Sequence, residues 1–70
     1  MPESIFLLTG DYIELIKLLK VLNIAESGAH AKFLVNSGKI IVNRNVEFRK
    51  RCKLRRGDNV IFEDKSIRIK

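Results

Sequence analysis

The amino-acid sequence predicts an α+β fold in which two short helices pack on a small antiparallel β-sheet. Two observations support this class. Residues 12–22 and 28–36 place apolar side chains at helical spacing, whereas much of residues 39–70 alternates apolar and polar side chains, as strands do. An extended arm and the two helices come first and the strands follow, which is the order expected of an α+β domain.

The length of the chain limits its organisation to one domain, residues 1–70. We assign residues 1–10 to an N-terminal arm or strand and residues 11–70 to the core motif. A domain of this size buries only about 60% of the surface that its unfolded chain exposes. Its core is therefore thin and leaves no room for a deep catalytic cleft, so we predict that the protein is not an enzyme.

The first helix is predicted to begin at Asp11 or Tyr12 and to end near Leu22. Asp11 followed by Glu14 matches a capping box, in which two side chains bind the free amides of the first turn. At 100° per residue, one face of this helix collects the apolar side chains Tyr12, Leu15, Ile16, Leu19 and Leu22. We expect this helix to be mainly a core element.

The second helix is predicted to span residues 28–36. Ser27 belongs to the residue types preferred at the N-cap. Gly38 follows the last turn and supplies the left-handed conformation that ends many helices. The face toward the core holds Ala31, Leu34 and Val35.

Phe33 lies almost opposite that core face. It either stacks on a nucleic-acid base or is covered by the apolar arm residues 5–8, which must pack against something. We expect the arm to cover it.

The strand pattern predicts two hairpins. In the first, residues 40–42 join a strand holding Val46 and Phe48 through the three-residue loop Asn43-Arg44-Asn45, because Asn tolerates positive φ. The second consists of strand 59–62, turn 63–66 and strand 67–70. Residues expected in the core include Leu15, Leu19, Leu34, Ile40, Val42, Val60 and Phe62.

Between the hairpins lies the segment Arg49–Arg56, called the basic stretch below. It holds six of the 14 Lys and Arg residues of a chain whose net charge is +6. Such a cluster attracts polyanions, and cations that neutralise phosphates release condensed counterions. The alternative is a solvated loop that serves only solubility, and the clustering favours contact with nucleic acid.

Cys52 and Leu54 alternate with the charges of the basic stretch, as in a half-buried extended segment whose cations point outward. Cys52 is either a reactive thiol, since cationic neighbours favour the thiolate, or a small apolar anchor. The alternation favours the anchor. His30 and Cys52 are the single histidine and the single cysteine, so we expect no metal site and no cofactor.

Three segments then carry a family resemblance: Ser27–Lys32, Gly38–Asn43 and Gly57–Val60. In this order and spacing they resemble the S4-like RNA-binding domain, also called the alpha-L motif. Glu26–Ala29 and Arg49–Lys53 make the chain more similar to the stand-alone bacterial YbcJ type of this family. The resemblance implies an RNA-binding module associated with ribosomal or other structured RNA, with the second helix and the loop beyond the first hairpin facing the RNA.

Carried over to this chain, the resemblance and the basic stretch together predict ten RNA-binding residues. They are Ser27, Lys32, Lys39, Arg44, Arg49, Lys50, Arg51, Lys53, Arg55 and Arg56. Two positions depart from the family pattern. Gly28 stands where the family often has Arg, which removes one phosphate contact, and Arg44 stands where the hairpin usually has Gly, which adds one.

The expected partner is therefore structured RNA, ribosomal RNA included, bound by a monomer in the cytoplasm. The amino terminus lacks a positive region before its four apolar residues, and no run is long enough to cross a membrane. We expect no membrane partner and no small-molecule substrate. The alternatives are a binder of DNA or of polyanions in general, and an adaptor that docks an acidic protein partner.

Overall fold

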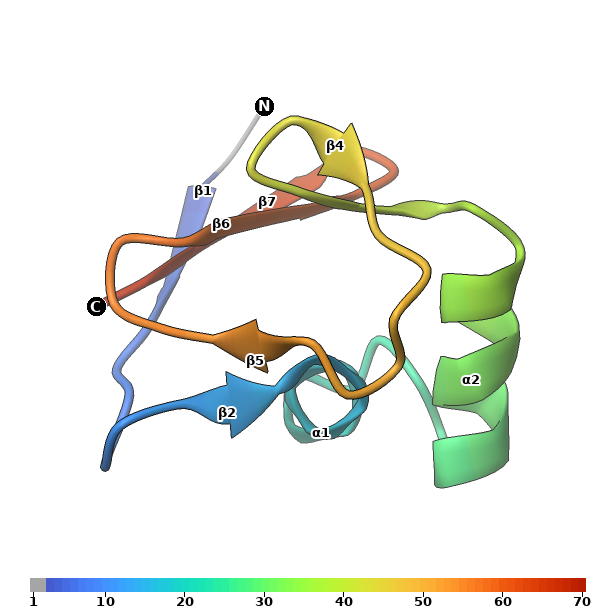
Figure 1. Cartoon of the computed structure of the whole chain (residues 1–70), viewed down its shortest axis with the longest axis horizontal. Helices are drawn as coiled ribbons and strands as arrows, with labels where there is room; N and C mark the ends of the chain where they lie inside the picture. The colour runs from blue at the N-terminus through green and yellow to red at the C-terminus, as the bar shows by residue number, and fades with distance from the viewer. Residues whose placement is uncertain (1–2) are drawn as a thin grey trace.

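The computed structural model describes residues 3–70; Met1 and Pro2, which belong to the predicted arm, lie outside the described residues. The elements in chain order are β1 (Glu3–Phe6), β2 (Ile13–Glu14), α1 (Leu15–Val21), α2 (Gly28–Asn36), β3 (Ile40–Val42), β4 (Asn45–Val46), β5 (Lys53–Leu54), β6 (Asn59–Phe62) and β7 (Lys65–Ile69). A five-stranded sheet has the order β1-β7-β6-β3-β4, and β2 and β5 form a second, two-stranded sheet. The α+β class is confirmed (Figure 1).

The arm completes the larger sheet. Residues 3–6 pair with β7 in parallel, for example Ser4 with Ile67 and Phe6 with Ile69, whereas the other neighbours are antiparallel. The sheet is therefore mixed. Because the arm uses its backbone to extend the sheet, it does not cover Phe33, which is 63% exposed. The expectation that the arm packs on Phe33 was wrong.

The core lies between the larger sheet and the two helices. Alternate residues of β3, β6 and β7 point into it, because side chains along a strand alternate between faces. All seven core residues predicted from the sequence are buried, Phe62 and Val42 at the margin with 8% exposed. The helices contribute Leu15, Leu18, Leu19, Ala31, Leu34 and Val35. Within residues 3–70, no helix is both long and apolar enough to pass through a membrane.

The start of α1 differs from the prediction. The helix begins at Leu15, its N-cap residue Glu14 makes no capping hydrogen bond with its side chain, and Tyr12 is 43% exposed. The expected capping box is absent because Glu14 and the residue before it form β2, paired with β5. The buried side chains of the helix are Leu15, Leu18 and Leu19.

The second helix matches its predicted bounds. The Ser27 Oγ accepts a hydrogen bond from the His30 amide at 3.1 Å. In return, His30 Nδ1 accepts one from the Glu26 amide at 3.1 Å. The two hydrogen bonds are reciprocal, but the second binds the amide of the residue before the N-cap, whereas a capping box would bind the amide of the N-cap Ser27. Gly38 has φ +78°, as the helix end requires.

Both hairpin turns are tighter than predicted. Asn43 and Arg44 have φ of 50° and 74°, and Asn45 already pairs with Val42, so the first turn has two central residues rather than three. Positive φ at both positions suits the right-handed twist of the adjoining strands. In the second hairpin Glu63 has φ 54°, and β7 begins at Lys65 instead of residue 67.

Candidate nucleic-acid interface

The basic stretch is an ordered part of the fold. It includes β5, which pairs with β2. The carbonyl of Cys52 accepts a hydrogen bond from the Leu15 amide at 2.9 Å, and that of Lys50 accepts one from the Ile16 amide at 3.2 Å. These are the free amides at the start of α1. The loop that carries the cations therefore also caps this helix.

The predicted alternation within the stretch is confirmed. Leu54 is fully buried, Cys52 is half-buried against the core, and Arg51, Lys53 and Arg55 are exposed. Burial first, and the Glu47 carboxylate second, raise the pKa of the Cys52 thiol. The neutral thiol is thereby favoured, which fits an anchoring residue rather than a nucleophile.

An open hollow lies along the stretch. Its lining consists of Arg49, Arg51, Cys52, Lys53 and Arg55. Four cations around one hollow favour an anionic ligand, and the guanidinium groups can bind phosphate through two parallel hydrogen bonds. This hollow is the candidate interface.

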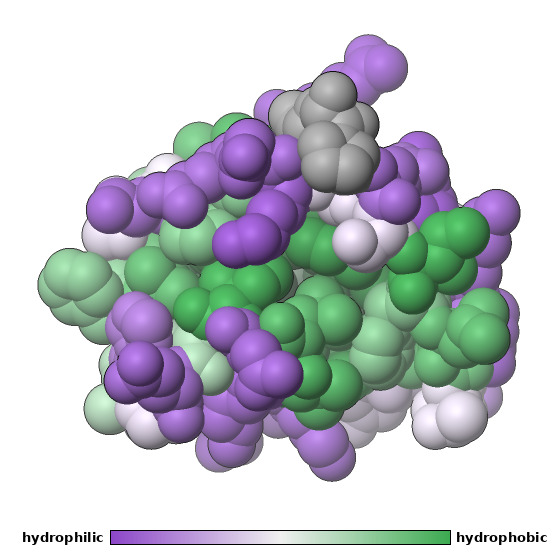
Figure 2. Space-filling view, turned by 180° about the vertical axis from the view of Figure 1, so that it is seen from behind, coloured by the Kyte–Doolittle hydropathy of each residue, from purple (hydrophilic) through white to green (hydrophobic). Residues whose placement is uncertain are grey.

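Other parts of the surface that the structure describes lack this concentration of cations. Seen from behind, the molecule displays hydrophobic side chains across the middle of that face (Figure 2). A hollow beside β1 and α1 has a mixed lining, in which the apolar side chains of Phe6, Leu8, Ile13 and Val21 lie beside Thr9, Tyr12, Glu14 and Lys17. Its lining holds one cation and one acid, whereas that of the basic stretch holds four cations and no acid, so it is less suited to an anionic ligand.

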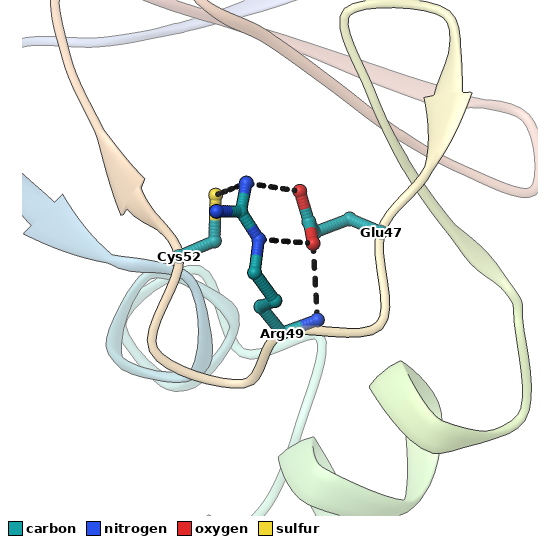
Figure 3. A network of polar contacts seen from close by, with 3 residues as sticks. All are labelled: Glu47, Arg49 and Cys52. Carbon is teal, nitrogen blue, oxygen red and sulfur yellow. Dashed lines mark hydrogen bonds and ion pairs between the residues drawn. The ribbon is translucent and has the colours of Figure 1, made fainter.

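Arg49, the first cation of the hollow, is bound by an acid. Its Nε and Nη2 donate to the two carboxylate oxygens of Glu47 at 2.9 and 3.1 Å (Figure 3). Nη2 also contacts the Cys52 Sγ at 3.8 Å. The hydrogen bonds from Arg49 lower the pKa of Glu47 to about 2, so this carboxylate is charged at neutral pH. Only Nη1 of Arg49 is left for a ligand.

Arg56, the last cation of the stretch, holds the arm. Its Nη1 donates to the Gly10 carbonyl and its Nη2 to the Leu8 carbonyl, both at 2.9 Å. A planar guanidinium can bind two acceptors at once, whereas an ammonium group cannot do so in this fixed geometry. The structure thus gives Arg56 a structural role.

The remaining cations of the stretch are more accessible. The Lys53 ammonium lies 5.0 Å from the centre of the Tyr12 ring, a cation–π contact that leaves its hydrogen-bond donors free. The side chains of Lys50, Arg51 and Arg55 make no hydrogen bond or ion pair with any of residues 3–70. They are the cations best able to meet a phosphate.

The predicted site residues outside the basic stretch do not line this hollow. Arg44 is in the β3–β4 turn and lines a separate hollow with residues of β6 and β7. Asp58 joins this turn to the basic stretch, because it accepts from the Asn43 side chain at 3.1 Å and from the Arg55 amide at 2.8 Å. Lys32 and Lys39 are exposed on α2 and just beyond it.

Sequence reasoning missed two residues that contact the cations of the stretch, Glu47 and Tyr12. Glu47 stands two residues before Arg49, a nearby acid that could have indicated pairing. Tyr12 was assigned to the helix, and its contact with Lys53 depends on the unpredicted pairing of β2 with β5. In the part of the chain that the structure describes, no three His, Cys, Asp or Glu side chains are grouped to hold a metal.

Comparisons with known proteins agree with this architecture. A family model described as the S4 domain matches residues 6–70. The putative RNA-binding protein YbcJ of Escherichia coli (strain K12) is 41% identical over 58 residues, which are 83% of each chain, and an uncharacterised YbcJ of Shigella flexneri matches equally. The solution structure of the E. coli YbcJ, described as revealing an alfaL motif involved in RNA binding, superimposes with a TM-score of 0.72 at 37% identity, covering 99% of this chain and 89% of that one. The chain belongs to the S4 domain family.

Proposed function

We propose that this protein is a non-enzymatic RNA-binding protein that contacts structured RNA, ribosomal RNA included, through the hollow of the basic stretch. The observation that carries the proposal is the lining of that hollow by four cations, held by β5 and by the cap of α1. The name of the E. coli relative and the description of its structure support RNA as the ligand.

The phosphates of the RNA are the groups that these cations bind. Lys50, Arg51 and Arg55 have free donors, and Lys53 keeps its ammonium hydrogens available above Tyr12. Each cation that meets a phosphate displaces condensed counterions, so the affinity falls as salt rises. The proposed surface also includes Ser27, Lys32, Lys39 and Arg44, which do not line the hollow.

Structured RNA fits this surface better than a long single strand. Aromatic residues make up 7% of the chain and none is Trp, so the protein lacks a row of stacking residues. Phosphates, 2′-hydroxyls and helix shape are the features through which proteins recognise folded RNA. A net charge of +6 opposes self-association, and we propose a monomer that acts in the cytoplasm.

The proposal is tested by competition. A labelled structured RNA is bound at low salt and displaced with unlabelled RNA of the same fold or with duplex DNA of equal length. RNA should compete more strongly, and the logarithm of the affinity should fall linearly with the logarithm of the salt concentration. Equal competition by DNA would make the protein a general polyanion binder. Retention in ribosomal fractions after nuclease treatment would instead favour the adaptor.

A further inference from the structure

Phe48 is an aromatic residue at the edge of the proposed interface. It is 60% exposed, and it directly precedes Arg49 of the hollow. Neighbouring Cα atoms are about 3.8 Å apart, so one nucleotide can reach both residues. Single exposed apolar residues are common on protein surfaces, and the surroundings of Phe48 decide what it does.

The backbone on both sides of Phe48 is fixed. The Glu47 amide donates to the Ile40 carbonyl at 2.9 Å, which holds the chain to β3. The Arg49 amide donates to the Glu47 Oε2 at 3.0 Å, beside the ion pair of the same two side chains (Figure 3). The hydrogen bonds of Glu47 and Arg49 therefore fix the backbone on both sides of Phe48. This fixed backbone holds the Phe48 ring in an exposed position.

One edge of the Phe48 ring rests against Gly38. A Cβ at Gly38 would lie 3.6 and 3.7 Å from Cε1 and Cζ of the ring, and 3.9 Å from the Val46 Cγ1. A Cβ at this position would make ordinary van der Waals contact with the ring, so the ring packs beside Gly38. Along the chain, Gly38 is followed by the exposed Lys39, and Phe48 is followed by the exposed Arg49.

We propose that Phe48 stacks on an unpaired base of the bound RNA while the hollow binds the adjoining phosphates. This inference rests on the proposed function and adds the kind of RNA, a duplex interrupted by at least one unpaired base. An unpaired nucleotide offers the π-face of its base to the ring and its backbone phosphate to the cations. An apolar protein surface would cover the ring but would desolvate those cations without a partner.

The test uses a blunt RNA duplex and the same duplex with one bulged adenosine. The protein should bind the bulged duplex more tightly. Phe48→Leu should weaken binding to the bulged duplex by about 5- to 150-fold, the range for losing one stacked base, and should leave the blunt duplex and the salt dependence unchanged. Phe48→Trp should keep the affinity. Because the wild-type chain has no Trp, the Trp at position 48 is the only one in this variant, and the bulged duplex should quench its fluorescence.

Val21→Trp is the matched control, since Val21 is 52% exposed at the end of α1, which holds none of the proposed RNA-binding residues. The fluorescence of a Trp at position 21 should not change when the bulged duplex is added. Quenching at position 21 and not at 48, or equal binding of both duplexes by wild type and Phe48→Leu, would overturn the stacking inference while leaving the proposed function intact. Failure of the wild type to bind either duplex in a salt-dependent way would overturn the proposed function itself.

Discussion

The two ends of the basic stretch differ from its middle. Arg49 is bound by Glu47 and Arg56 by two backbone carbonyls, whereas Lys50, Arg51 and Arg55 have no such partner among residues 3–70. All carry the same charge and are close in sequence. The comparison shows that a count of cations overstates the number of hydrogen-bond donors available to a ligand, because Arg49 and Arg56 use theirs within the fold.

The largest expected effect is in the middle of the stretch. The triple variant Lys50→Ala, Arg51→Ala and Arg55→Ala should reduce the slope of log affinity against log salt by roughly 0.7–0.9 for each phosphate that is no longer neutralised. Salt titrations of RNA binding measure this slope. A control variant with Ala at Lys17, Lys20 and Lys70 removes the same charge from other exposed positions and should change the slope much less. Equal slopes in the two triple variants would contradict the assignment.

The next largest effect, on stability, is expected at Arg56, the last residue of the basic stretch. Arg56→Ala should destabilise the protein by about 1–3 kcal/mol, because two carbonyl groups lose a charged donor, and should leave the salt slope near that of wild type. Urea unfolding gives the free energy of unfolding. Arg56→Lys keeps the charge without the planar fork and should recover only part of the stability. A fully stable Arg56→Ala variant with a reduced slope would place this residue at the RNA instead.

A smaller effect is expected at the start of α2. Ser27→Ala should cost about 1 kcal/mol of stability, because the His30 amide loses its acceptor. Ser27→Asp retains an acceptor and serves as the control for capping. Thermal unfolding and RNA titration are compared for both variants. A loss of affinity that exceeds the loss of stability would make Ser27 a direct contact.

The smallest effect is at the Glu47–Arg49 pair, which is largely exposed on the Arg49 side. The pKa of Glu47 is about 2 when folded, against an ordinary 4.5. Because the pKa of Glu47 is lower in the folded than in the unfolded protein, its ionised carboxylate stabilises the fold at pH values above 4.5. This stabilisation is lost as the pH falls from about 4.5 to about 2. The stability difference between wild type and Glu47→Gln should therefore shrink over this window. At neutral pH, Glu47→Gln should also steepen the salt slope, because the Nε edge of Arg49 becomes available.

The two helix starts show how far sequence reasoning reaches. The start of α2 depends on Ser27 and His30, three residues apart, and its bounds were predicted correctly. The start of α1 depends on β5, which lies far along the chain, so the local pattern of Asp11 and Glu14 was misleading. Pairing between distant segments overrode the local preference, as tertiary context often does.

The candidate site shows the same limit. The charge cluster and the anchoring of Cys52 and Leu54 follow from local alternation and were predicted. The acceptors of Arg56 are 46 and 48 residues away, at Gly10 and Leu8. No spacing rule connects such distant positions, so sequence reasoning could not find these hydrogen bonds of Arg56.

The hydrogen bonds from the Leu15 and Ile16 amides to the basic stretch link the surface to the interior. Exchange of these two protons with solvent requires the loop to leave the start of α1. A ligand that immobilises the loop slows this opening, since it stabilises the state that it binds. Two amides of residues that lie outside the proposed interface would therefore report RNA binding by slower deuterium uptake, with no substitution in the protein.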